Sequence, residues 1–160
     1  MAMDKKKIDQ SKKELSDTIK YEQRELKSLS DSKRSAMDAY ADVLGLQDID
    51  PELCQEIMNR QSEDIRNIER IGSEHAETIR EAKEKGDKIA EEADDTLNAA
   101  KKAADRLNKL GKTLEKVGIT AISDAADNSQ KNADMWEKEK QEIIDKNSDL
   151  EDLKREYQNL

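Results

Sequence analysis

The residue types that most often carry chemistry are scarce in this chain. His75 is the only histidine and Cys54 the only cysteine, so a zinc site, a catalytic triad or a proton relay that needs a second such residue cannot form. The Glu-x-x-His unit of di-iron helical bundles would need a glutamate at position 72, and that residue is Gly72. We therefore predict no catalytic residue, no metal site and no cofactor, and a protein that is not an enzyme.

His75 and Cys54 have structural explanations instead. His75 falls on position d of a heptad pattern, where a polar side chain sets the register of packed helices. A pH-sensitive contact is the alternative role for an imidazole at such a position. Cys54 follows Asp50 in the first turn of a predicted helix, and we interpret it as a small buried apolar side chain.

The composition favours thin helical packing over a thick globular core. Charged residues make up 42% of the 160 residues, hydrophobic residues 34% and aromatic residues 2%, with a formal net charge of -9. Such values are typical of disordered chains or of coiled coils. The negative charge argues against nucleic acid as a partner, because binding to phosphates needs a positive surface.

Residues 58 to 121 contain the pattern that distinguishes these two classes. An apolar or small residue returns there at alternating steps of four and three, as in Ile65, Ile68, Ile79, Ile89 and Leu107. This spacing is a heptad a/d pattern held for roughly nine repeats, and it predicts a long helix packed against other helices. We expect residues 1–160 to form a single helical coiled-coil domain.

Two glycine-containing turns divide the chain into three predicted helices, over residues 6–44, 52–117 and 120–158. Gly45 and Gly118 are each predicted to end a helix as a left-handed residue. Asp50 and Pro51 have the residue types of a helix N-cap and first helical position, and Ile49 is predicted to pack on Cys54 as a hydrophobic staple. For the third helix, Thr120 or Ser123 is the predicted cap.

The predicted fold is all-α, an elongated antiparallel coiled coil of these three long helices. In this arrangement the outer helices fold back along the two ends of the middle one. The alternative is a four-helix up-down bundle, in which the middle helix breaks at Gly86. A glycine costs about 1 kcal/mol against alanine in a helix interior, but Gly86 is in phase with the heptads, so we favour the unbroken helix.

Small side chains occupy many heptad positions of the middle helix. They let a neighbouring helix approach closely but bury little area, which suits either close packing within the chain or the docking of a partner helix. Trp136, the only tryptophan, is either an anchor of the third helix or a partner contact. The predicted partner-contact residues are Gly72, Ala82, Gly86, Ala93, Ala100, Ala103 and Trp136.

These observations predict a non-catalytic helical protein–protein interaction module. It would act as an adaptor or chaperone-like helper that packs against a helical segment of a larger protein or against a second copy of itself as a homodimer. A structural coiled-coil spacer is the alternative, and a carrier of a ligand or metal is disfavoured by the missing ligand sets. A single cysteine and the lack of a membrane span or signal sequence predict a cytoplasmic protein, although secretion without a cleaved signal stays open.

Overall fold

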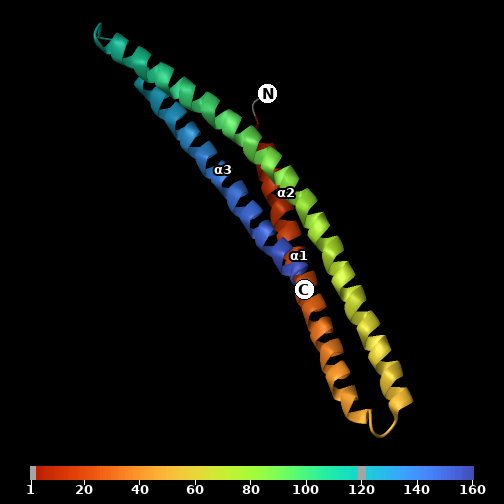
Figure 1. The fold of residues 1–160 in the computed structure, drawn as a ribbon. Coiled ribbons are helices and arrows are strands. Elements are labelled where there is room, and N and C mark those ends of the chain that lie inside the picture. Colours follow the sequence, from red (N-terminus) through yellow and green to blue (C-terminus); the bar gives the residue numbers. More distant parts are fainter. Residues whose placement is uncertain (1–2, 119–121) are drawn as a thin grey trace. The chain divides into compact units, whose positions relative to one another are not determined.

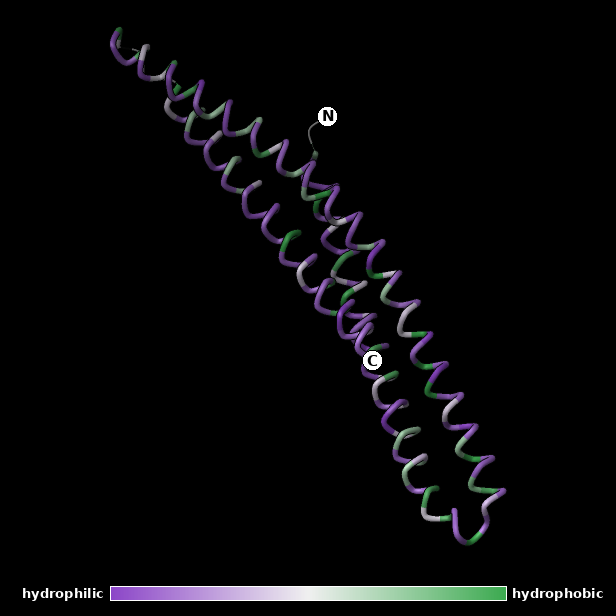
Figure 2. Tube along the Cα trace, viewed as in Figure 1, coloured by the Kyte–Doolittle hydropathy of each residue, from purple (hydrophilic) through white to green (hydrophobic). Residues whose placement is uncertain are grey.

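The computed structural model describes residues 3–118 and 122–160, and these are helical without any strand. Helix α1 is Lys5–Val43, a 3-10 turn η1 is Leu44–Leu46, α2 is Pro51–Glu115 and α3 is Ser123–Gln158 (Figure 1). Apolar residues recur between polar ones along all three helices (Figure 2). None of the helices in the described ranges has an apolar stretch sufficient to span a lipid bilayer.

The start of α2 follows from its local sequence. Asp50 accepts a hydrogen bond from the backbone N–H of Leu53 at 3.1 Å, and Pro51 is the first helical residue, which confirms the predicted cap. Cys54 is 2% exposed, as predicted, and its thiol donates to the Val43 carbonyl. The predicted staple is wrong, because Ile49 is 78% exposed and the packing beside Cys54 comes from the end of α1.

The two glycine turns differ, although Leu44-Gly45-Leu46 and Val117-Gly118-Ile119 look alike in sequence. Gly118 has a φ of 81°, which is the left-handed conformation predicted for it. The same prediction is wrong for Gly45, which lies inside η1 with a negative φ. There α1 tightens into a right-handed 3-10 turn instead of closing on a left-handed residue. The predicted cap Thr120, together with Ile119, lies outside the described residues, and Ser123 is already the first residue of α3.

Contacts between the helices group the chain into two compact units. Unit 1 is the described part of Met1–Ser16 together with Lys83–Ser148, and unit 2 is Asp17–Ala82 together with Asp149–Leu160. In each unit three helices pack against one another. Helix α2 runs through the unit boundary and through Gly86 as one helix.

In unit 1 the start of α1 packs antiparallel to α2. The backbone N–H of Met3 donates to the Thr96 hydroxyl at 2.9 Å, and Lys7 pairs with Glu92 at 2.7 Å. Between these two contacts the residue number rises along α1 and falls along α2, so the two helices run in opposite directions. Met3 marks the level of α2 at which α1 begins.

Helix α3 lies antiparallel to the same part of α2. Lys140 pairs with Asp94 at 2.7 Å, and further along α3 the Asn147 amide donates to Asp87 at 2.7 Å. Helices α1 and α3 are therefore parallel to each other on two sides of α2.

Unit 2 repeats this arrangement with other residues. His75 contacts Glu22 at 2.7 Å and Lys33 pairs with Glu69 at 3.3 Å, so α1 and α2 are again antiparallel. The Tyr157 hydroxyl of α3 donates to the Glu22 carbonyl at 2.7 Å. The end of α3 thus packs between the same two helices.

The heptad positions of α2 divide between its two neighbours. His75 and Thr96, both at position d, contact α1, whereas Gly72 and Gly86, at position a, face α3. A third series one residue after d is also buried, and it consists of Ala76, Leu97 and Ala104. A helix that packs on two neighbours needs a wider apolar face than the two-position seam predicted from the sequence.

This division explains where the predicted seam is wrong. Ala103, Leu110 and Val117 continue the d series of the heptad pattern beyond Thr96, a position that faces a neighbouring helix in a coiled coil. Ala103 is exposed, Leu110 is 46% exposed and Val117 is 69% exposed. No described residue of α1 lies opposite them, because α1 begins at the level of Thr96.

Candidate helix-docking surfaces

A polar cluster from all three helices lies inside unit 2. Glu22 is 2% exposed, and its carboxylate contacts the His75 imidazole. The Tyr157 ring stacks on His75 with centroids 5.0 Å apart and an interplanar angle of 7°. Burial, together with the hydrogen bond to Glu22, raises the pKa of Tyr157, so this phenol stays a hydrogen-bond donor. The cluster fixes the level at which α3 meets the other two helices, as a polar layer does in a coiled coil.

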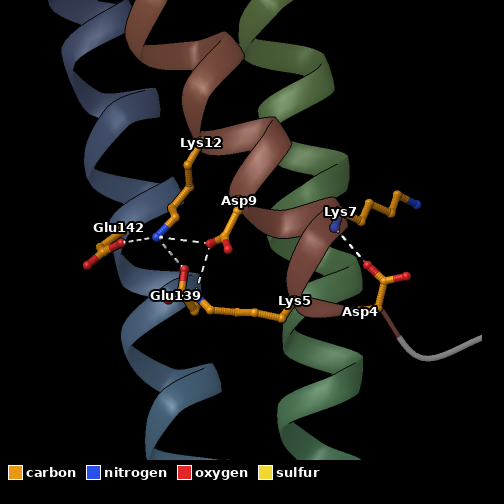
Figure 3. A network of polar contacts seen from close by, with 7 residues as sticks. All are labelled: Asp4, Lys5, Lys7, Asp9, Lys12, Glu139 and Glu142. Carbon is orange, nitrogen blue, oxygen red and sulfur yellow. Dashed lines mark hydrogen bonds and ion pairs between the residues drawn. The ribbon is translucent and has the colours of Figure 1, made fainter.

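A charged network occupies the corresponding place in unit 1 (Figure 3). Glu139 of α3 is 5% exposed and pairs with Lys5 at 2.5 Å and Lys12 at 2.6 Å, both from α1. Lys12 also pairs with Glu142 at 2.7 Å, and Asp9 pairs with Lys5 at 2.9 Å. Lys5 and Lys12 therefore join the start of α1 to α3.

The network keeps Glu139 ionised despite its burial. Burial alone would raise the pKa of Glu139, but the hydrogen bonds from Lys12 and Lys5 outweigh it, and the pKa lies below its ordinary value of 4.5. The Lys5 partners, Glu139 first and then Asp9, raise the pKa of that lysine. Opposite charges that face one another in this way hold α1 and α3 in one register.

Gly86 gives space to a buried amide. The Asn147 side chain lies against the backbone of Gly86, so that a Cβ atom there would come within 2.8 Å of its Cγ. The Asn147 amide nitrogen donates to Asp87 at 2.7 Å, while its oxygen is buried without a hydrogen-bond partner among the described residues. Close approach, not a break in the helix, accounts for this glycine.

The predicted partner-contact residues are placed mainly inside the chain's own packing. Gly72, Gly86, Ala93, Ala100 and Trp136 are buried, Ala82 is half-buried, and Ala103 is exposed. Gly72 lies against the last turn of α3, where its Cβ position is 3.3 Å from the Tyr157 carbonyl oxygen. The small-residue stripe thus lets α3 approach α2 closely, and its role in contacting a partner stays a prediction.

An open groove lies where the end of α3 leaves α1 and α2. Lys33 donates to the Leu160 carbonyl, and Leu160 also contacts the Gly72 site, which marks the last level that α3 covers. Beyond it, a hollow of about 350 Å³ is lined by Met37, Tyr40, Ser62, Ile65, Arg66 and Glu69. A second hollow along α1 and the end of α3 shares Met37 with it. Only the first hollow lies between α1 and α2 beyond Leu160, and we call it the α3 slot.

Sequence reasoning missed this slot. Ile65 belongs to the predicted heptad pattern, but Ile65 and Tyr40 are only half-buried, and Met37 is 53% exposed. The signal that could have found the slot is the length of the helices. Two outer helices of about 40 residues cannot both cover a middle helix of about 65 over its whole length, so some seam residues must have one neighbour only.

Within the described residues, no group of three or more His, Cys, Asp or Glu side chains could hold a metal ion. Comparison of the chain with protein-family models, curated proteins and solved structures gives no match.

Proposed function

We propose that this protein is a non-catalytic helical interaction module whose α3 slot binds a helix. The observation that carries the proposal is the groove beyond Leu160, where α1 and α2 present apolar side chains with no third helix over them in the described residues. Met37, Tyr40 and Ile65 supply apolar contacts, and Arg66 and Glu69 supply polar ones at the edge. Amphipathic helices bind grooves of this composition.

The chain's own α3 supports this proposal. It already lies on α1 and α2 up to Leu160, parallel to α1, with Tyr157 and Leu160 over the Gly72 site. A helix that enters the slot would continue the same path with the same heptad spacing. In this proposal the three helices form an antiparallel coiled coil, which ends in two-helix segments instead of closing as a four-helix bundle.

The protein would then serve as an adaptor or chaperone-like helper in the cytoplasm that covers a helical segment. A structural spacer is the alternative function. A spacer needs no apolar groove, and exposed Met37 favours the adaptor.

A photo-cross-linking amino acid placed at Met37 in the full chain tests the proposal. We expect covalent adducts in cells that produce the protein, and mass spectrometry should locate the cross-linked peptide in a helical segment. Tyr21 is the matched control, because it is also on α1 and is 51% exposed, against 53% for Met37. Tyr21 lines neither the α3 slot nor the second hollow beside α3. Equal yields at both positions, or none at Met37, would reject the α3 slot as a binding site.

A further inference from the structure

The last part of α2 exposes apolar residues at the heptad position that contacts α1 elsewhere. His75 and Thr96, at position d, both meet α1, which begins at the level of Thr96. The next d residues along α2 are Ala103 and Leu110, and both are exposed. They continue the interface with α1, but no described residue of α1 lies over them. We call this uncovered helix position in unit 1 the α1 slot.

Basic side chains lie beside the apolar residues of the α1 slot. Lys102 and Lys109 each directly precede a residue at position d, and Arg106 is at position g. All three are exposed, and none has an ion pair among the described residues. Positions c and g lie on the same side of a helix as position d. Glu92, which pairs with Lys7 of α1, is also at position g, so these basic residues are on the side of α2 that faces α1.

The acidic residues of the same part of α2 lie on another face. They are Asp105 at position f and Glu115 at position b, and both positions are opposite the side formed by d and g. On α3, Glu139 faces α1, and the residue one heptad before it is Asn132, which is exposed and uncharged. The side of the α1 slot that would face a third helix is therefore basic on α2 and, at the level of Asn132, neutral on α3.

This arrangement is the reverse of the one that α1 itself uses. Where α1 is present, its Lys7 pairs with Glu92 of α2 at 2.7 Å, and two other lysines of α1 pair with Glu139 of α3 (Figure 3). In the α1 slot, Arg106 is two heptads beyond Glu92, and Asn132 is one heptad before Glu139. A basic helix such as the start of α1 would be repelled there, whereas carboxylates would find partners.

From the exposed apolar residues and the basic residues beside them, we propose that the α1 slot binds an acidic amphipathic helix of a partner protein. The helix lies along α2 as α1 does elsewhere, with apolar side chains over Ala103 and Leu110 and carboxylates beside Lys102, Arg106 and Lys109. The inference goes beyond the proposed function, because the α1 slot belongs to unit 1 and the α3 slot to unit 2.

Fluorescence anisotropy of the full chain with two designed helical peptides tests the inference. Both peptides carry leucine at positions a and d over three heptads, and positions e and g are glutamate in one peptide and glutamine in the other. The glutamate peptide should bind at least about tenfold more tightly at an ionic strength of about 0.05 M, and less than about threefold more tightly at about 0.5 M. Because the chain carries a net charge of -9, non-specific electrostatics would favour the glutamine peptide. Equal binding at low salt, tighter binding of the glutamine peptide or no binding overturns the inference.

Charge reversal locates the binding surface. The triple variant Lys102→Glu, Arg106→Glu, Lys109→Glu should weaken binding of the glutamate peptide at least about tenfold, and binding of the glutamine peptide by less than about threefold. Circular dichroism should show the helix content of the parent, because all three side chains are exposed. Unchanged binding of the glutamate peptide by the folded variant would contradict the assignment to the α1 slot.

Lys20→Glu, Arg24→Glu, Lys27→Glu is the matched control. These residues have the same types and the same spacing, they are exposed, and they lie on α1 in unit 2. The control should bind the glutamate peptide within about threefold of the parent. An equal loss in the control would attribute binding to the overall charge of the chain and overturn the inference.

The apolar residues distinguish a helix from other anionic partners. Leu110→Asn should weaken binding of the glutamate peptide at least about fivefold, because the exposed Leu110 side chain supplies an apolar contact. Displacement of this peptide by phosphatidylserine vesicles or by single-stranded RNA, without an effect of Leu110→Asn, would make a phosphate-bearing partner the occupant and overturn the inference. The mass in sedimentation velocity should be the same before and after charge reversal. A fall in mass would make a second copy the occupant, which also overturns it.

The inference and the proposed function fail separately. If a cross-linker at Met37 captures no helix while the glutamate peptide binds the α1 slot, the proposed function falls and the inference stands. If Met37 captures a helix while the charge reversal leaves binding of the glutamate peptide unchanged, the inference falls and the proposed function stands.

Discussion

At the scale of single residues, buried polar groups fix how the helices meet. Glu139 is held between two lysines in unit 1, Asn147 lies over Gly86, and Glu22 is covered by His75 and Tyr157 in unit 2. An apolar side chain at the same position would pack with less dependence on the exact placement of its neighbours. Polar groups in such positions disfavour other registers, because a slip would leave them unpaired.

The first prediction concerns Gly86 and Asn147. Gly86→Ala should destabilise the protein by about 1–3 kcal/mol, because the new Cβ meets the Asn147 side chain. In an Asn147→Ala background the same change should instead stabilise by up to about 1 kcal/mol, the helix preference of alanine over glycine. Urea unfolding of the four proteins measures this cycle. Equal effects of Gly86→Ala in both backgrounds would mean that the two residues do not touch.

The second prediction concerns the pH dependence of the Glu139 network. The pKa of Glu139 is lowered in the folded state, so its contribution to stability is present above its ordinary pKa of 4.5 and is lost as pH falls through the lower folded value. Glu139→Gln should cost about 1–3 kcal/mol at pH 7, and the gap from the parent should narrow below pH 4.5. Thermal unfolding across this pH range provides the measurement.

Glu142→Gln is the control for that prediction. Glu142 also pairs with Lys12, but its side chain is 37% exposed, against 7% for Glu139. The cost of Glu142→Gln should be smaller, within about 1 kcal/mol. A gap for Glu139→Gln that stays constant down to pH 3 would contradict an ionised, paired Glu139.

At the scale of elements, α2 is the central helix of both units, and its neighbours decide which apolar residues are buried. Leu97 is 1% exposed, whereas Leu110 is 46% exposed although it lies thirteen residues further along the same helix. Leu110 is at position d of the heptad pattern, and Leu97 is one residue after position d. The difference arises because α1 begins at the level of Thr96, so no described residue of α1 lies opposite Leu110.

The third prediction follows from that difference. Leu97→Ala should cost about 2–5 kcal/mol, since it opens a cavity in packed surroundings. Leu110→Ala should cost less than about 1 kcal/mol, because half of the side chain remains in water in the folded state. Chemical denaturation of both variants measures the contrast. Equal large losses would show that Leu110 is buried in solution.

At the scale of the whole molecule, the net charge of -9 is distributed unevenly along the sequence. Residues 34–71 carry a net charge of -5, residues 97–118 carry +4 and residues 123–135 carry -2. Exposed charges interact mainly within a Debye length of about 10 Å, so the local charge of each segment matters more than the sum over the chain.

The fourth prediction tests the continuity of α2 through both units. Lys85→Pro should cost about 3 kcal/mol or more, because proline removes a backbone hydrogen bond and clashes with the preceding turn. Lys85→Ala is the control and should stay within about 0.5 kcal/mol, since Lys85 is exposed. Circular dichroism and urea unfolding report the helix content and stability. A chain with a turn beside Gly86 would tolerate the proline without loss.

The sequence alone determined the helices and most of their ends. Heptad spacing predicted three long helices, and the residue types of Asp50 and Pro51 correctly placed the start of α2. These features depend on local backbone chemistry, namely the satisfaction of free N–H groups and a fixed proline φ, so a short stretch of sequence contains what is needed.

Only the tertiary structure decided how α2 shares its faces and where they stay open. The heptad pattern runs through Ala103 and Leu110, but their burial depends on whether α1 reaches them, which is a property of helix offset. Likewise Gly45 and Gly118 have similar neighbours in sequence and different backbone conformations. The contacts that fix the offset between helices join residues more than fifty positions apart, such as Glu22 with His75 or Gly86 with Asn147. Heptad spacing has no information on such an offset, because the pattern fits equally well when one helix slides past another by a whole heptad.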